Sequence, residues 1–143
     1  MLTNLSEGSF TPKDELENRI NQLRQNMEKQ GLEFSIILQN VDLFYFAGTV
    51  QKGVLVVSVD HGPLLFIERN VERAVVETGL EITPIKRDKD VIDILMSRGM
   101  LKGKWGMELD VVPVSVYERW KSFLGFEGAI DVWPLIRDLR IVK

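Results

Sequence analysis

Acidic side chains are the groups in this chain whose spacing could support metal chemistry. Glu108 and Asp110 stand two positions apart in the segment KWGMELDVV, residues 104–112. On a β-strand, residues two apart face the same side of the sheet, and two carboxylates on one side could hold Mg²⁺ for a hydrolytic reaction. The pair therefore indicates one candidate activity, that of a small Mg²⁺-dependent hydrolase or nuclease. Solvation of both carboxylates at a strand end is the alternative, because no other pattern in the chain adds to the metal interpretation.

Residue types for other common reactions are scarce. His61 is the only histidine, and it stands between Asp60 and Gly62, where a turn is expected. It lacks the partners of a catalytic triad or of a histidine metal site. The chain has no cysteine, which removes disulfides and thiolate metal sites. It also has no G-x-x-x-x-G-K-[ST] phosphate loop, no G-x-G-x-x-G motif and no G-x-S-x-G nucleophile elbow.

Aromatic residues are more informative than these polar groups. Phe44, Tyr45 and Phe46 are consecutive, so their side chains cannot all face one core. At least one ring is expected to reach the surface, where an exposed aromatic can mark an interface. Burial of all three rings between a sheet and its helices is the alternative. Trp133, directly before Pro134, is a second candidate interface residue.

Composition and charge narrow the class of protein. The 143 residues are 45% hydrophobic and 27% charged, with a formal net charge of −3, which fits one soluble domain. The negative charge disfavours non-specific binding of nucleic acid. The longest apolar run, GVLVVSV, is far shorter than the roughly 20 residues of a membrane span. We therefore expect neither a nucleic-acid nor a membrane partner, and with no secretory signal we expect a cytoplasmic protein.

The clearest structural element is a helix over residues 11–31. Four apolar residues recur at helical spacing and form one stripe: Leu16, Ile20, Leu23 and Met27. Thr11 suits the N-cap, Pro12 the first helical position and Gly31 the position after the helix.

The rest of the chain alternates between strand and helix patterns. Strands are predicted at 33–40, 53–59, 64–69, 80–87, 104–112 and 126–133, and further helices at 70–79, 88–99, 113–125 and from 134 onward. The segment VDLFYFAG, residues 41–48, could be a strand end or a single helical turn. Pro84 places its strand at a sheet edge or a strand end. The pattern predicts an α/β fold, with a mixed sheet of about five to six strands flanked by helices.

This order also predicts the domain organisation. Residues 1–10 are expected to form a flexible tail, and residues 11–133 a single folded domain without repeats or linkers. Residues 134–143, PLIRDLRIVK, begin a further helix that the chain does not finish.

Several segments together resemble the N-terminal domain of the creatinase/prolidase family over about residues 12–143. They are RINQLRQNMEKQGLEFSIILQNVDLFYFAG, GVLVVSVDHGPLLFIE, GKWGMELDVVPVSVYERW and IDVWPLIRDLRIVK. The first contains a turn similar to the family's Tyr-x-Thr-Gly turn. It reads Tyr45-Phe46-Ala47-Gly48 here, with alanine where the family usually has threonine. The last is similar to the junction at which the family's linking helix begins, so residues 134–143 would be the start of that linker.

The resemblance implies a ribonuclease-H-like sheet and a catalytic domain of pita-bread fold that follows it. In that second domain two Asp, one His and two Glu bind two metal ions, usually Mn²⁺, Co²⁺ or Zn²⁺. Most such enzymes cleave the bond before proline, whereas creatinase hydrolyses creatine without metal. None of those metal ligands can be placed on this chain, so no catalytic or metal residue is expected in it.

For this chain the resemblance implies partners and an access role. The partners would be the protein's own catalytic domain and a second subunit in a homodimer. Tyr45, with Asp42 and Leu43, occupies the turn that would approach a catalytic site and limit substrate length. Phe44, Phe46 and Trp133 are the interface candidates.

Three hypotheses follow. The favoured one is a non-catalytic N-terminal domain of an Xaa-Pro dipeptidase or aminopeptidase; whether the whole enzyme is one of these or of creatinase type stays open. The second is a small Mg²⁺-dependent hydrolase on a ribonuclease-H-like sheet, using the Glu108–Asp110 pair. The third is a free-standing protein-interaction domain that uses residues 44–46.

Overall fold

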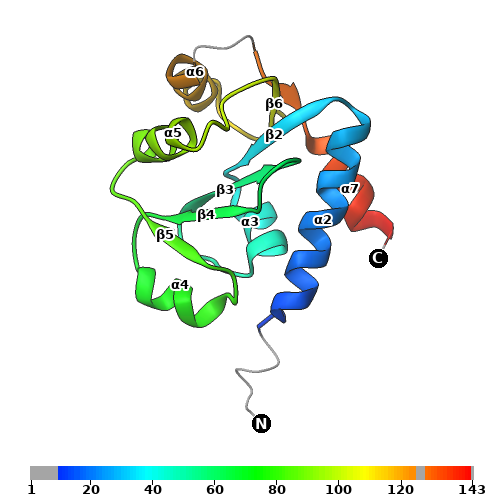
Figure 1. Cartoon of the computed structure of the whole chain (residues 1–143). Helices are drawn as coiled ribbons and strands as arrows, with labels where there is room; N and C mark the ends of the chain where they lie inside the picture. Colours follow the sequence, from blue (N-terminus) through cyan, green and yellow to red (C-terminus); the bar gives the residue numbers. More distant parts are fainter. Residues whose placement is uncertain (1–9, 125–127, 143) are drawn as a thin grey trace.

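Six strands form one mixed sheet, in the spatial order β5-β4-β3-β2-β6-β7 (Figure 1). The computed structural model describes residues 10–124 and 128–142. The strands are β2 (Leu32–Ile37), β3 (Gly53–Ser58), β4 (Leu64–Ile67), β5 (Ile82–Pro84), β6 (Lys104–Met107) and β7 (Ile130–Asp131). The helices are α2 (Lys13–Lys29), α3 (Asn40–Ala47), α4 (Val71–Glu77), α5 (Asp88–Ser97), α6 (Val114–Leu124) and α7 (Trp133–Val142). The predicted α/β class and strand number are confirmed.

Strand pairing follows the sequence signals. β3 pairs antiparallel with both β2 and β4, so the predicted hairpin is confirmed. The pairs β2–β6, β4–β5 and β6–β7 are parallel. Consecutive parallel strands need a long crossover connection, and α4 supplies it between β4 and β5 and α6 between β6 and β7. Pro84 is the last residue of the edge strand β5, where its missing N–H removes no bond from the sheet interior.

Alternation along the strands builds two apolar layers. In β3, Leu55 and Val57 face one side and Val54 and Val56 face the other. The first side is covered by α2, α3, α4 and α7. The second is covered by α5 and α6 (Figure 1). Of the helices in the described residues, four thus lie on one side of the sheet and two on the other.

The long first helix matches its predicted stripe, whose four residues are all buried. Its start differs by one position: the helix begins at Lys13, and Pro12 rather than Thr11 is the N-cap. The cause is the extended ψ of Pro12, 148°, which places this residue outside the helix while its carbonyl accepts from the N–H groups of Glu15 and Leu16. Gly31 has φ +76° and ends the helix as predicted.

The ambiguous segment 41–48 is a two-turn helix, α3. Its start is fixed by Gln39, whose side chain accepts from the Asp42 N–H at 3.0 Å. Its end is fixed by Gly48, which has φ +77° and whose N–H donates to the Phe44 carbonyl at 2.9 Å. A side chain at position 48 would meet strain at this φ and contact Leu16.

The C-terminal region agrees with the prediction in type but not in bounds. Within the described residues the last strand is only Ile130–Asp131, and residues 125–127 lie outside the described part. α7 begins at Trp133, one residue before Pro134, and packs beside α2. The predicted tail, residues 1–10, lies outside the described part except for Phe10. None of the helices described in 10–124 and 128–142 is long and apolar enough to cross a bilayer.

Candidate functional site

The corner formed by α3 contains most of the residues that the sequence singled out. Helical periodicity turns the consecutive aromatics in different directions. Phe44 is 42% exposed, Tyr45 is half-buried and Phe46 is completely buried. The prediction that one ring reaches the surface is confirmed. Phe46 and Leu43, however, lie in the core, so neither offers side-chain surface to a partner.

Tyr45 is held between two arginines from different helices. The guanidinium carbon of Arg19, on α2, lies 4.3 Å from the ring centroid, and that of Arg140, on α7, lies 5.9 Å from it. Cations over an aromatic face at these distances attract it. Arg19 also donates to the Tyr45 backbone carbonyl at 2.8 Å. The ring is thereby held by side chains from α2 and α7.

Asp42 connects α3 to α7 through a buried contact. Its carboxylate is almost inaccessible to solvent, and Oδ1 lies 3.2 Å from Arg140 Nη1. A buried carboxylate needs such a partner because burial removes its hydration. Asp42 therefore links α3 to α7.

Glu108 follows β6, and its side chain is completely buried. Its Oε1 accepts from the Leu38 N–H at 2.7 Å, and both carboxylate oxygens accept from the Gln39 N–H at 3.2 Å. Burial and the neighbouring Asp42 carboxylate raise the pKa of Glu108 to about 9, because both disfavour its charged form. At neutral pH Glu108 is therefore protonated and shares a hydrogen bond with Asp42.

The expected strand pair of Glu108 and Asp110 is wrong. β6 ends at Met107, so both residues follow the strand, with Glu108 buried and Asp110 exposed. A protonated carboxyl bound to backbone amides is a poor Mg²⁺ ligand, since the ion prefers carboxylates. Within 10–124 and 128–142, no three His, Cys, Asp or Glu residues are grouped as a metal site would need.

Trp133 and His61 are the remaining residues that the sequence singled out. Trp133 is half-buried at the start of α7, where its backbone N–H donates to Asp131 Oδ1 at 3.0 Å. His61 lies in the β3–β4 turn, and its backbone N–H donates to Ser58 Oγ at 3.3 Å. Trp133 packs against the core cluster that contains Leu43 and Phe46 of α3, whereas His61 does not belong to that cluster.

A second polar network fixes the segment that leaves α3. Glu77, at the end of α4, accepts from the Thr49 hydroxyl at 2.6 Å, the Val50 N–H at 3.1 Å and Gln51 Nε2 at 3.1 Å. Hydrogen bonds from Thr49, Val50 and Gln51, with the nearby charge of Arg73, outweigh the raising effect of burial and lower the pKa of Glu77. α3 is therefore attached at two points. Asp42, near its start, binds Arg140 of α7, and the segment after its end binds Glu77 of α4.

The contact between Arg140 and Asp42 leads to a prediction about coupling. Arg140→Ala should lower the free energy of unfolding by about 1–2 kcal/mol, because it leaves a buried carboxylate without its cation. Asp42→Asn in the Arg140→Ala background should then cost less than it does alone, by roughly 1 kcal/mol. Urea unfolding of the four proteins gives the coupling energy. Simple additivity of the two costs would show that the contact carries no energy.

Comparison with known proteins decides the family. Residues 19–142 match the family model described as the Creatinase/Prolidase N-terminal domain. The chain belongs to this family. The Xaa-Pro dipeptidase of Pyrococcus furiosus is 25% identical over 130 residues, which are 90% of this chain and 36% of the relative. The chain thus spans about a third of the length of the curated relative that it matches.

Solved structures agree on the fold of this family member. The prolidase from Pyrococcus horikoshii OT3 has a TM-score of 0.74 at 20% identity, covering 87% of this chain and 35% of that one. An Xaa-Pro aminopeptidase from Streptococcus pyogenes has a TM-score of 0.75 at 20% identity, covering 90% of this chain and 100% of that one. The second match extends over the whole of that solved chain.

Proposed function

We propose that this chain acts as the non-catalytic N-terminal domain of an Xaa-Pro peptidase, in which the α3 corner limits substrate access. The family match over residues 19–142 carries the proposal. Relatives and structural neighbours bear the names Xaa-Pro dipeptidase, prolidase and Xaa-Pro aminopeptidase. Catalysis would belong to the part of such enzymes that this chain does not match, together with the two divalent ions, Mn²⁺, Co²⁺ or Zn²⁺, that the family implies.

The geometry of the α3 corner supports the access role. Tyr45 is held by Arg19 and Arg140, while Phe44 on the same helix presents its ring to solvent. A rigid, exposed ring on a pinned helix can obstruct a neighbouring site at low entropic cost. Leu43 and Asp42 contribute by holding the helix, since both are buried.

The same corner supports a role in assembly. Val41, Phe44 and Val50 are large apolar residues exposed on or next to α3. Exposed apolar residues that lie together favour contact with a partner surface. In our proposal these residues and Trp133 face the protein's own catalytic domain or the second subunit of a homodimer. A free-standing interaction domain is the second candidate function, favoured by the same three residues. It requires that a partner bind the chain without a catalytic domain.

The division of labour is tested by assaying the chain on its own. Purified chain with Mn²⁺, Co²⁺ or Zn²⁺ should not hydrolyse Ala-Pro or Leu-Pro above the rate of buffer. A fusion that places residues 11–142 in front of the catalytic part of the Pyrococcus furiosus dipeptidase should hydrolyse both. Metal-dependent turnover by the chain alone, lost on adding a chelator, would contradict the proposal.

A further inference from the structure

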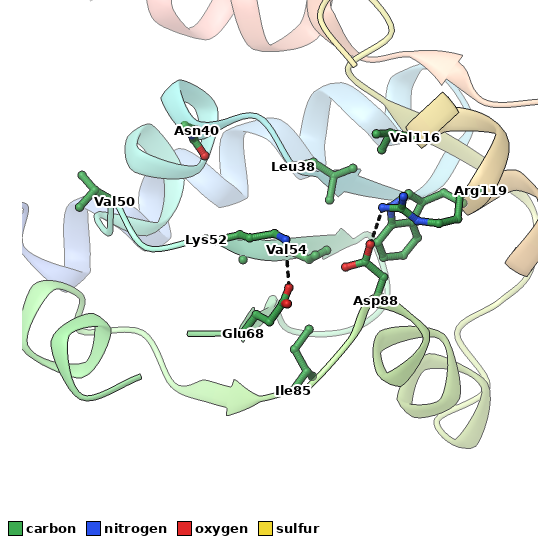
Figure 2. A pocket seen from close by; sticks show the side chains of 12 residues that line it. Leu38, Asn40, Val50, Lys52, Val54, Glu68, Ile85, Asp88, Val116 and Arg119 are labelled. Atoms are coloured by element: carbon green, nitrogen blue, oxygen red, sulfur yellow. Dashed lines mark hydrogen bonds and ion pairs between the residues drawn. The ribbon is translucent and has the colours of Figure 1, made fainter. Parts of the chain in front are cut away.

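A groove opens on the sheet face that carries only α5 and α6, beside the start of β3 (Figure 2). Its volume is about 450 Å³, which lies within the roughly 300–1,000 Å³ of small-ligand sites. The apolar part of the lining consists of Leu38, Val50, Val54, Ile85, Val116 and Trp120. These side chains come from β3, from the segment between β2 and α3, from the segment after α3, from the segment after β5 and from α6, so the groove is built by five parts of the fold.

Two ion pairs cross this apolar surface (Figure 2). Lys52 Nζ lies 3.3 Å from Glu68 Oε1, and Arg119 Nη2 lies 2.7 Å from Asp88 Oδ2. In both pairs the base is the more accessible partner: the side chains are 68% and 48% exposed for Lys52 and Arg119, against 19% and 21% for Glu68 and Asp88. A ligand entering from solvent therefore meets the two cations before the carboxylates.

The excess of positive charge continues into an adjoining depression of about 400 Å³. The four paired residues line it as well, and Arg87, Lys89 and Phe123 are added. Four bases thus face two acids, although Arg87 also lies 3.6 Å from Asp90 outside the depression. This balance favours a negatively charged group over a positively charged one.

Trp120 adds a second, independent sign of a binding site. The residue lines the groove and is completely buried, yet its indole N–H has no hydrogen-bond partner among the residues that the structure describes. Buried tryptophan N–H groups usually find an acceptor. An acceptor supplied by a ligand would satisfy it after a small movement of the groove wall.

We propose that this groove binds a small amphipathic carboxylate, with its apolar side chain against Val54 and Val116 and its carboxylate between Lys52 and Arg119. Carboxylates suit both bases, and the planar fork of arginine binds them with two parallel hydrogen bonds. Phe44 is not part of the lining, although Asn40 of α3 and Val50 after it are, so the proposal does not depend on whether the exposed ring of α3 limits access to a peptidase.

Titration of the chain with N-acetyl-L-leucine, followed by ¹H–¹⁵N NMR, tests the proposal. The chain has three tryptophans, so Trp120→Phe assigns the Trp120 indole resonance directly. We expect that resonance to shift saturably at millimolar ligand, with N-acetyl-L-leucinamide binding about five-fold more weakly because it lacks the charge. Equal affinity for the acid and the amide, or no Trp120 shift by about 20 mM acid, would overturn the proposal.

Two substitutions test whether the carboxylate of the ligand binds between Lys52 and Arg119. Arg119→Gln and Lys52→Gln should each weaken binding of the acid about five-fold and leave binding of the amide unchanged. The matched control is Arg98→Gln, at an exposed position after α5 and outside the groove lining, which should change neither. Dispersed NMR spectra of each variant verify folding. Unchanged affinity in both folded groove variants would overturn the proposal as well.

Discussion

The free energy of unfolding should fall as pH rises from about 5 to 8, with a slope of up to roughly 1.4 kcal/mol per pH unit. The cause is Glu108, whose pKa is raised from 4.5 to about 9 in the folded chain. In this window the unfolded chain has an ionised Glu108 while the folded chain keeps its proton. The folded state therefore binds one more proton, and loss of protons from solution destabilises it.

Glu108→Gln should remove most of this slope. The amide keeps an oxygen for the N–H groups of Leu38 and Gln39 and a donor for Asp42, but it does not titrate. We expect the variant to match the original chain within about 1 kcal/mol near pH 5 and to exceed its stability near pH 8. Glu108→Ala, by contrast, should cost about 3 kcal/mol near pH 5, because two backbone N–H groups lose their acceptor.

Urea unfolding at several pH values measures both effects. The matched control is Glu118→Gln, which removes an exposed carboxylate on α6 and should leave the slope unchanged. A flat profile for the original chain between pH 5 and 8, or an equal slope in the Glu108→Gln variant, would show that Glu108 is ionised in the folded state.

Glu77→Ala should lower the free energy of unfolding by about 2 kcal/mol at neutral pH. The substitution leaves the Thr49 hydroxyl and the Val50 N–H without their acceptor and removes the partner of Gln51. Glu77→Gln keeps one acceptor oxygen and should cost about half as much. Glu81→Ala, at an exposed position before β5, is the control and should change stability by less than about 0.5 kcal/mol.

The sign of the pH effect is opposite for Glu77. Its pKa is lowered in the folded chain, so its stabilisation is present above the unfolded pKa and is lost as pH falls through the folded one. The cost of Glu77→Ala should therefore shrink on acidification below about pH 4. A cost that stays constant down to that pH would mean that the carboxylate charge does not contribute.

Most of the fold could be predicted because its signals are local. The stripe in α2 repeats at helical spacing, β3 and β4 are apolar runs joined by a Gly-Pro turn, and Pro84 marks an edge. Each of these features depends on a few residues that are close together in the sequence. The α3 segment was ambiguous because its large apolar residues fit either element, and its N-cap is a glutamine, which is not among the strongly preferred capping residues.

The site could be predicted only in part, because its contacts join distant segments. Asp42 and Glu108 were both singled out, but the contact between their side chains requires the end of β6 and α3 to be neighbours, which no local pattern shows. Arg140 lies 98 positions from Asp42, so nothing near Asp42 indicates its cation. Glu108 offered one usable signal: an acid directly after the apolar run of β6 is a candidate for burial. Glu77 offered none.

The most direct measurement of the central claim is the length selectivity of a peptidase that carries this domain. In the active fusion with the Pyrococcus furiosus catalytic part, Phe44→Ala removes an exposed ring from α3 and should leave stability nearly unchanged. We expect kcat/KM for tri- and tetrapeptides to rise about five-fold relative to Ala-Pro, because the ring no longer obstructs longer substrates. Val76→Ala, an exposed valine on α4, should leave the ratio unchanged. An unaltered ratio in a folded, active Phe44→Ala fusion would contradict the access role of α3.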